Sequence, residues 1–161
     1  MADVTLLDGG MGQELVARSG DAPTPLWATQ VMIDHPGLVR DVHADYFAAG
    51  STVATTNTYA IHHDRLVKFD IDDRFASLHA QAMSEAAEAC AAHGSGRIAG
   101  SLGPLGASYR ADVLPEHRKA VALYEEVARH IGPKSDFLIA ETVASLDHAR
   151  AVLEGAKAAG K

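Results

Sequence analysis

Two carboxylates, an amide, several hydroxyls and a set of glycines stand at four separate points of this sequence, each directly after a short apolar run. In chain order the four groups are Asp8-Gly9-Gly10, Thr55-Thr56-Asn57-Thr58-Tyr59, Ser101-Leu102-Gly103-Pro104-Leu105-Gly106 and Glu141-Thr142. Carboxylates bind ammonium groups, amides and hydroxyls bind other polar groups, and glycines let the backbone approach a ligand closely. Gathered in one place, they suit a small polar ligand that carries an amino group.

The apolar pattern predicts the elements that would gather these groups. Strands are predicted at residues 4–7, 52–56, 97–102 and 136–140, and helices at residues 36–49, 74–93, 115–131 and 145–159. Strands that alternate with helices form a parallel sheet with the helices packed outside it. The carboxyl ends of parallel strands meet on one face, where such folds bind their ligands. The sequence therefore predicts an α/β domain with a ligand site at the strand ends.

Capping residues predict where several helices begin and end. Pro36 suits the first turn of its helix, with Asp34 as the cap just before it. Ser145 is a suitable cap for the last helix, and Gly94 is a suitable stop for the second.

Asp8 lies at the end of the first predicted strand, before a helical pattern formed by Met11, Leu15 and Val16. This position directs its carboxylate toward a ligand above the sheet. The alternative is that Asp8 only caps the turn that follows it.

Composition excludes several classes of protein. The 161 residues are 47% hydrophobic and 22% charged, which is typical of one globular domain. The net charge of −7 argues against a nucleic-acid-binding protein. No apolar run is long enough for a membrane span, and the N-terminus lacks the pattern of a secretory signal. With one cysteine there is no internal disulfide framework, so we expect a soluble cytoplasmic protein.

Other candidate groups carry weaker signals. Gly10 and Gly12 lack the third glycine of a dinucleotide-binding motif. His62 and His63 are adjacent, so their side chains diverge and joint metal binding is not expected. Cys90 lies on an alanine-rich helix, where a small core residue is more common than a nucleophile.

The four strand-end motifs, taken in order, resemble the homocysteine S-methyltransferase family. The resemblance rests on Leu-Asp-Gly-Gly-Met-Gly, Thr-Asn-Thr-Tyr, Gly-Ser-Leu-Gly-Pro-Leu-Gly and Glu-Thr, and it extends over nearly the whole chain. The family includes betaine–homocysteine methyltransferases and the homocysteine-binding domain of cobalamin-dependent methionine synthase. Its fold is a (βα)8 TIM barrel, which usually needs about 250 residues. With about four βα units, residues 1–161 look like the N-terminal half of the homocysteine-binding domain.

The resemblance implies a methyltransferase that moves a methyl group from a small-molecule donor to the thiol of homocysteine, giving methionine. Asp8 and Gly9 match positions near the homocysteine, and Glu141 matches the carboxylate that binds its amino group. Thr56, Asn57, Thr58 and Gly103 match residues that line the pocket. One alternative is a non-catalytic amino-acid-binding fragment or a decayed homologue that lacks the zinc cysteines. Another is an unrelated α/β enzyme whose strand-end carboxylates do acid–base chemistry.

The resemblance also implies zinc, which binds the substrate sulfur as a reactive thiolate. In the family, three cysteines of the second half of the barrel hold this ion, and Cys90 matches none of them. The resemblance thus assigns no metal ligand and no catalytic side chain to this chain.

A half barrel would leave its first and fourth strands as open edges, which can pair with another chain. We therefore expect self-association through these edges.

Overall fold

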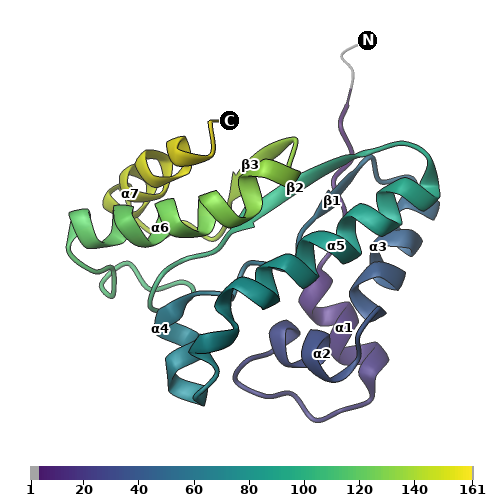
Figure 1. Ribbon diagram of the computed structural model, residues 1–161, viewed down its shortest axis with the longest axis horizontal. Coiled ribbons are helices and arrows are strands. Elements are labelled where there is room, and N and C mark those ends of the chain that lie inside the picture. Colours follow the sequence, from purple (N-terminus) through teal and green to yellow (C-terminus); the bar gives the residue numbers. More distant parts are fainter. Residues whose placement is uncertain (1–3, 161) are drawn as a thin grey trace.

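The computed structural model describes residues 4–160 and is built around a three-stranded parallel sheet (Figure 1). The strands are β1 (Val53–Thr55), β2 (Arg97–Leu102) and β3 (Phe137–Ala140), in the order β1-β2-β3. Val53 lies opposite Arg97, and Ala99 lies opposite Phe137. The sheet confirms three of the four predicted strands and their parallel direction. Three strands form an open sheet, and a closed barrel is not shown in this chain.

Four helices match the predicted ones and pack in pairs: α3 (Leu38–Ala48), α5 (Phe75–His93), α6 (His117–Ile131) and α7 (Leu146–Ala156). Figure 1 shows α6 beside α7 at the left and α3 beside α5 at the right. The buried face of α6 carries Val121, Tyr124, Val127 and Ile131, which recur at helical spacing. None of the helices within residues 4–160 is long and apolar enough to cross a lipid bilayer.

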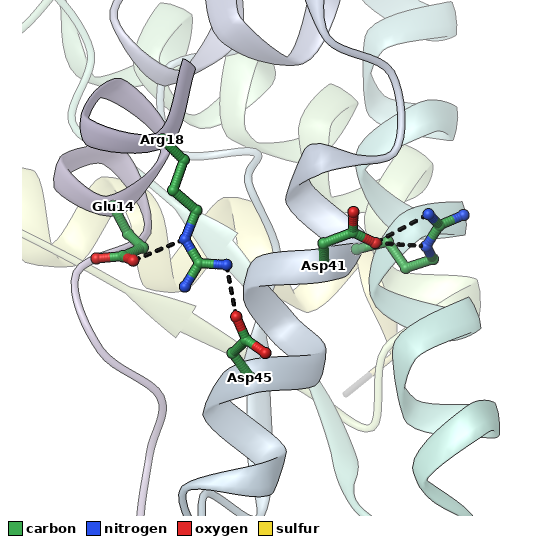
Figure 2. Close-up of polar contacts among 5 residues, drawn as sticks. Glu14, Arg18, Asp41 and Asp45 are labelled. Carbon is green, nitrogen blue, oxygen red and sulfur yellow. Dashed lines mark hydrogen bonds and ion pairs between the residues drawn. The ribbon is translucent and has the colours of Figure 1, made fainter. Parts of the chain in front are cut away.

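Shorter elements complete the fold. The three short helices are α1 (Met11–Ser19), α2 (Ala28–Asp34) and α4 (His63–Leu66), and the 3-10 turns are η1 (Val67–Phe69), η2 (Asp72–Arg74), η3 (Gly132–Lys134) and η4 (Lys157–Ala159). Arg18 of α1 joins Glu14 of the same helix to Asp45 of α3, at 2.7 and 2.5 Å (Figure 2). The two ion pairs link α1 to α3.

The strand predicted at residues 4–7 is wrong, because this segment is extended but has no regular strand pairing. Its contact with the sheet is a backbone hydrogen bond from Thr52 N to Leu6 O at 2.9 Å, joined by one from the Thr52 hydroxyl. Val4 is 87% exposed and Leu6 is 52% exposed, so the apolar run is not buried as a central strand would be. Both hydrogen bonds go to one carbonyl, Leu6 O, whereas a pair of β-strands needs hydrogen bonds that repeat along both strands.

Side chains, instead of a neighbouring strand, satisfy the outer edge of β1. The Ser51 hydroxyl donates to Val53 O at 2.6 Å and accepts from Val53 N at 3.2 Å. The Asp8 carboxylate accepts from Thr55 N at 2.6 Å and from the Thr55 hydroxyl at 2.5 Å. These bonds occupy Val53 N, Val53 O and Thr55 N, which are backbone groups that a pairing strand would need.

Helix boundaries test the capping predictions. The prediction for Pro36 and Asp34 is wrong, since α3 begins after Gly37, whose φ of 92° is left-handed, and Pro36 lies in the preceding turn. The Asp34 carboxylate instead accepts from Gln30 of its own helix at 2.8 Å. Ser145 caps α7 as predicted by accepting from His148 N, and Gly94 ends α5 with a φ of 81°.

We expect the isolated chain to self-associate through β3, which is an edge strand of the sheet. Light scattering over a series of protein concentrations in the micromolar range should show a mass that rises above 16.9 kDa. A monodisperse monomer with a cooperative thermal melt over the whole series would contradict this expectation.

Candidate functional site

A cleft of about 510 Å³ lies at the carboxyl ends of the strands, between the segment that precedes α1 and the loops that follow β1, β2 and β3. Five of the seven predicted site residues line it: Asp8, Gly9, Thr56, Asn57 and Glu141. They come from three parts of the chain that are far apart in sequence. The topology of the sheet thus brings most of the predicted groups to one place, as the strand-end pattern predicts.

Thr58 and Gly103 lie behind the wall of the cleft instead of in it. The Thr58 hydroxyl is fully buried and donates to Ser101 O at 2.7 Å. A Cβ on Gly103 would lie 2.0 Å from Tyr59 O, so this glycine lets the loop after β2 pack directly on the backbone of Tyr59. Both residues therefore shape the wall, and neither is among the residues that line it.

The Asp8 carboxylate forms a structural link to β1. Its side chain is 3% exposed, both its oxygens accept hydrogen bonds from Thr55, and Oδ2 lies 3.6 Å from Nδ1 of the buried His43. Burial raises the pKa of Asp8, but the interactions with His43 and Thr55 outweigh burial, and the pKa lies below its usual value. Asp8 therefore stays ionised at neutral pH, and its carboxylate links the segment before α1 to β1 at the border of the cleft.

Glu141 is the carboxylate that remains available to a ligand. It follows β3 directly and is half-buried, and Oε1 accepts from the Ser101 hydroxyl at 2.5 Å. Ser101 is itself fixed, because its backbone N donates to the Thr56 hydroxyl at 3.0 Å. Oε2 has no hydrogen-bond partner within residues 4–160. One oxygen thus positions the carboxylate and leaves the other free to accept from a ligand.

Backbone strain is concentrated around this cleft. The residues other than glycine with positive φ in the described chain are Trp27, Asp70, Tyr109 and Thr142, at 50°, 57°, 61° and 53°. Three of these four line the cleft, and the exception is Asp70. Such conformations persist only where the surrounding structure enforces them, and they collect at functional sites. Their positions support the cleft as the working site of the fold.

Arg65, Ser108 and Tyr109 also line the cleft, although none of the sequence motifs includes them. Arg65 lies on α4 and reaches the cleft beside Tyr59, whose hydroxyl is hydrogen-bonded to Ser108 at 2.8 Å. One signal could have pointed to Arg65: it is the only Lys or Arg between Arg40 and Lys68. Nothing in the sequence marks Ser108 and Tyr109, which come from the irregular loop after β2.

The potential metal ligands of the chain do not converge. Within residues 4–160 no three side chains of His, Cys, Asp or Glu are grouped so that they could hold a metal ion. Cys90 is half-buried on α5, away from the cleft lining, and burial raises the pKa of its thiol. His62 is buried, whereas His63 contacts Asp72 at 2.6 Å and Glu126 at 3.3 Å. The two adjacent imidazoles thus have separate surroundings.

Comparison with known proteins gives consistent matches. A family model described as homocysteine S-methyltransferase matches residues 5–161. The homocysteine S-methyltransferase of Escherichia coli K12 is 35% identical over 118 residues, which cover 68% of this chain and 38% of that protein. Homocysteine S-methyltransferase YbgG of Bacillus subtilis is 29% identical over 176 residues, which cover 92% of this chain and 53% of that protein.

A solved structure matches the fold as well. The crystal structure of the homocysteine methyltransferase MmuM from Escherichia coli, in its metallated form, has a TM-score of 0.87 and 28% identity. The match covers 98% of this chain and 60% of that one. The matches therefore cover 38%, 53% and 60% of these three relatives, which is under two thirds of each.

Proposed function

The chain belongs to the homocysteine S-methyltransferase family, and from this membership we propose that its cleft binds homocysteine. In this proposal residues 1–161 are part of a homocysteine-binding domain. The whole enzyme transfers a methyl group from a small-molecule donor to the homocysteine thiol and so forms methionine.

The observation that carries the proposal is the arrangement of Glu141 in the cleft. Oε1 is fixed by Ser101 at 2.5 Å, and the other oxygen is free to accept from an ammonium group of a ligand. A charge-assisted hydrogen bond of this kind is stronger than one between neutral groups. Thr56 and Asn57 line the same cleft. Asp8 and Gly9 supply the opposite wall, and a Cβ on Gly9 would lie 2.7 Å from the Tyr46 ring, so a larger residue would displace this wall.

Replacing Glu141 with Gln is expected to weaken homocysteine binding by roughly tenfold or more, because hydrogen bonds to charged groups contribute about 1.5–3 kcal/mol. Gln keeps the size of the side chain and an acceptor for Ser101, so the melting temperature should change little. Isothermal titration calorimetry of the 161-residue chain with L-homocysteine measures the first effect, and circular dichroism measures the second.

Glu125→Gln is the matched control, because Glu125 lies on α6 in an exposed pair with Arg129 at 3.1 Å, outside the cleft. It should bind homocysteine as the unmodified chain does. Equal affinity of Glu141→Gln and the unmodified chain would refute the role of Glu141.

Zinc is the ion that the resemblance assigns to the family, where it holds the substrate sulfur as a thiolate. The described residues do not fit such an ion. A catalytic zinc site typically has three protein ligands, and residues 4–160 offer no group of three potential ligands and a single cysteine that lies outside the cleft. Within this chain we therefore assign to the cleft residues the binding and orientation of homocysteine alone.

A further inference from the structure

Arg65 occupies a fixed place in the cleft. Its helix α4 follows the loop after β1, and its side chain is half-buried. Nη2 donates to Pro104 O at 2.9 Å, and the guanidinium carbon lies 5.6 Å from the centre of the Tyr59 ring. One contact thus comes from the loop after β2 and the other from the segment after β1. The guanidinium is held in position without any ligand.

The guanidinium has no negative partner in the described chain. Within residues 4–160 no carboxylate oxygen lies within 4 Å of its nitrogens, and Nε is buried without a hydrogen-bond partner. The adjacent Asp64 accepts from Gly106 N through Oδ2 at 2.5 Å, and its Oδ1 is buried without a hydrogen-bond partner and lies more than 4 Å from the guanidinium nitrogens. Arg18 and Arg110, by contrast, both contact carboxylates. A half-buried cation with no counter-ion that borders an open cleft favours an anionic ligand there.

The charges that line the cleft fit a zwitterion. Glu141 has one carboxylate oxygen without a hydrogen-bond partner in the described chain, and Arg65 supplies a positive charge. The Asp8 carboxylate already accepts hydrogen bonds from Thr55. A ligand with an ammonium group and a carboxylate would meet one opposite charge for each of its own. The planar guanidinium is suited to a carboxylate, which it can bind through two parallel hydrogen bonds.

We propose that Arg65 binds the carboxylate of a zwitterionic ligand in this cleft. The inference rests on the proposed function, and it adds a residue and a ligand group that the sequence motifs do not assign. Two sources could supply the carboxylate: the amino acid acceptor, homocysteine, and a zwitterionic methyl donor such as betaine. The carboxylate is common to both.

The test compares each ligand with a counterpart that lacks the carboxylate. L-homocysteine is compared with 3-aminopropane-1-thiol, and glycine betaine with choline, by calorimetry on the 161-residue chain and on Arg65→Met. We expect Arg65→Met to lose roughly tenfold or more in affinity for the carboxylate-bearing member of one pair. Affinity for the member without the carboxylate should be unchanged. A loss of affinity for homocysteine shows that Arg65 binds the carboxylate of the methyl acceptor. A loss of affinity for betaine shows that it binds the carboxylate of the methyl donor.

Two further variants make the test specific. Arg97→Met is the matched control, because Arg97 also lies over an aromatic ring, that of Phe137 at 4.3 Å, but does not line the cleft. It should bind every ligand as the unmodified chain does. Arg65→Lys keeps the charge without the planar fork and should retain part of the affinity that Arg65→Met loses. Arg65→Lys also replaces Arg65→Met in the test if Arg65→Met fails to fold.

The outcomes separate this inference from the proposed function. If Glu141→Gln weakens homocysteine binding while neither Arg65 variant changes the affinity for homocysteine or betaine, the role of Arg65 is overturned and the proposed function stands. If the unmodified chain binds neither homocysteine nor betaine at millimolar concentration, both are overturned.

Discussion

The 161-residue chain, incubated with homocysteine and either S-methylmethionine or betaine, is expected to form no methionine above the protein-free background. The reason is the state of the substrate sulfur. A free thiol has a pKa of about 8.5, so only a few per cent is thiolate at neutral pH, and the thiolate is the nucleophile. The charged side chains that line the cleft have a net negative charge, which does not raise the thiolate fraction. Asp8 and Glu141 are negative and would disfavour a thiolate, while Arg65 supplies a single positive charge.

Methionine formation should be measured by chromatography beside a zinc determination on the same purified chain. A full-length family enzyme with its three cysteines, assayed in parallel, is the positive control and should turn over. Soft thiolate ligands are suited to zinc, and the described part of this chain has one cysteine, on a helix outside the cleft. Stoichiometric zinc together with turnover by the 161-residue chain would contradict the expectation.

Acidification from pH 6.5 to pH 4.5 is expected to lower the free energy of unfolding by about 5 kcal/mol. His62 and His79 are each 1% exposed, and burial is the main cause that lowers the pKa of each to about 3. Between pH 6.5 and pH 3 the unfolded chain binds protons at these imidazoles and the folded chain does not. Stability therefore falls as the pH falls, by about 1.4 kcal/mol per pH unit for each histidine.

His63 acts in the opposite direction. Burial lowers its pKa, but Asp72 and Glu126 outweigh burial and raise it, so protonation of His63 favours the folded state. That contribution is fully present below the unfolded pKa of about 6.5 and is lost as the pH rises through the folded value. Because its side chain is 32% exposed, we expect it to offset only a small part of the loss from His62 and His79.

Urea unfolding followed by circular dichroism at pH 6.5, 5.5 and 4.5 measures this dependence. His79→Gln removes one buried imidazole and should make the dependence on pH shallower. His117→Gln, at an exposed position where the imidazole contacts Glu154 at 3.1 Å, is the matched control and should keep the slope of the unmodified chain. Equal slopes for all three proteins would show that His79 does not contribute to the loss of stability in acid.

The regular elements were predictable because their signals are local. Strand β2 (Arg97–Leu102) has the predicted bounds, and α5 and α6 begin within two residues of the predicted positions. Apolar spacing and terminal glycines fix such elements along the chain itself. The segment at residues 4–7 has the same apolar pattern and yet is no strand, because a strand also needs partners, and the pattern cannot show whether partners are present.

The residues of the cleft that lie at strand ends were predictable from the sequence, and the residues that lie further along the loops were not. Asn57 and Glu141 line the cleft because they lie within two residues of the ends of β1 and β3. Thr58 lies one residue further along and turns into the core, where it bonds to Ser101 O. Arg65 reaches the cleft only through the path of the chain between β1 and α4, which no motif encodes.

The difference between the two edges of the sheet sets the symmetry of any assembly. Ser51 and Asp8 bond to the outer edge of β1, so within residues 4–160 the sheet has one unoccupied edge, that of β3, with which to pair. Head-to-tail addition would join β3 of one copy to β1 of the next, and it would have to displace these side-chain hydrogen bonds. Two copies can still join β3 to β3, antiparallel and about a two-fold axis. Such pairing is closed at two subunits, so the chain should form dimers and not fibres.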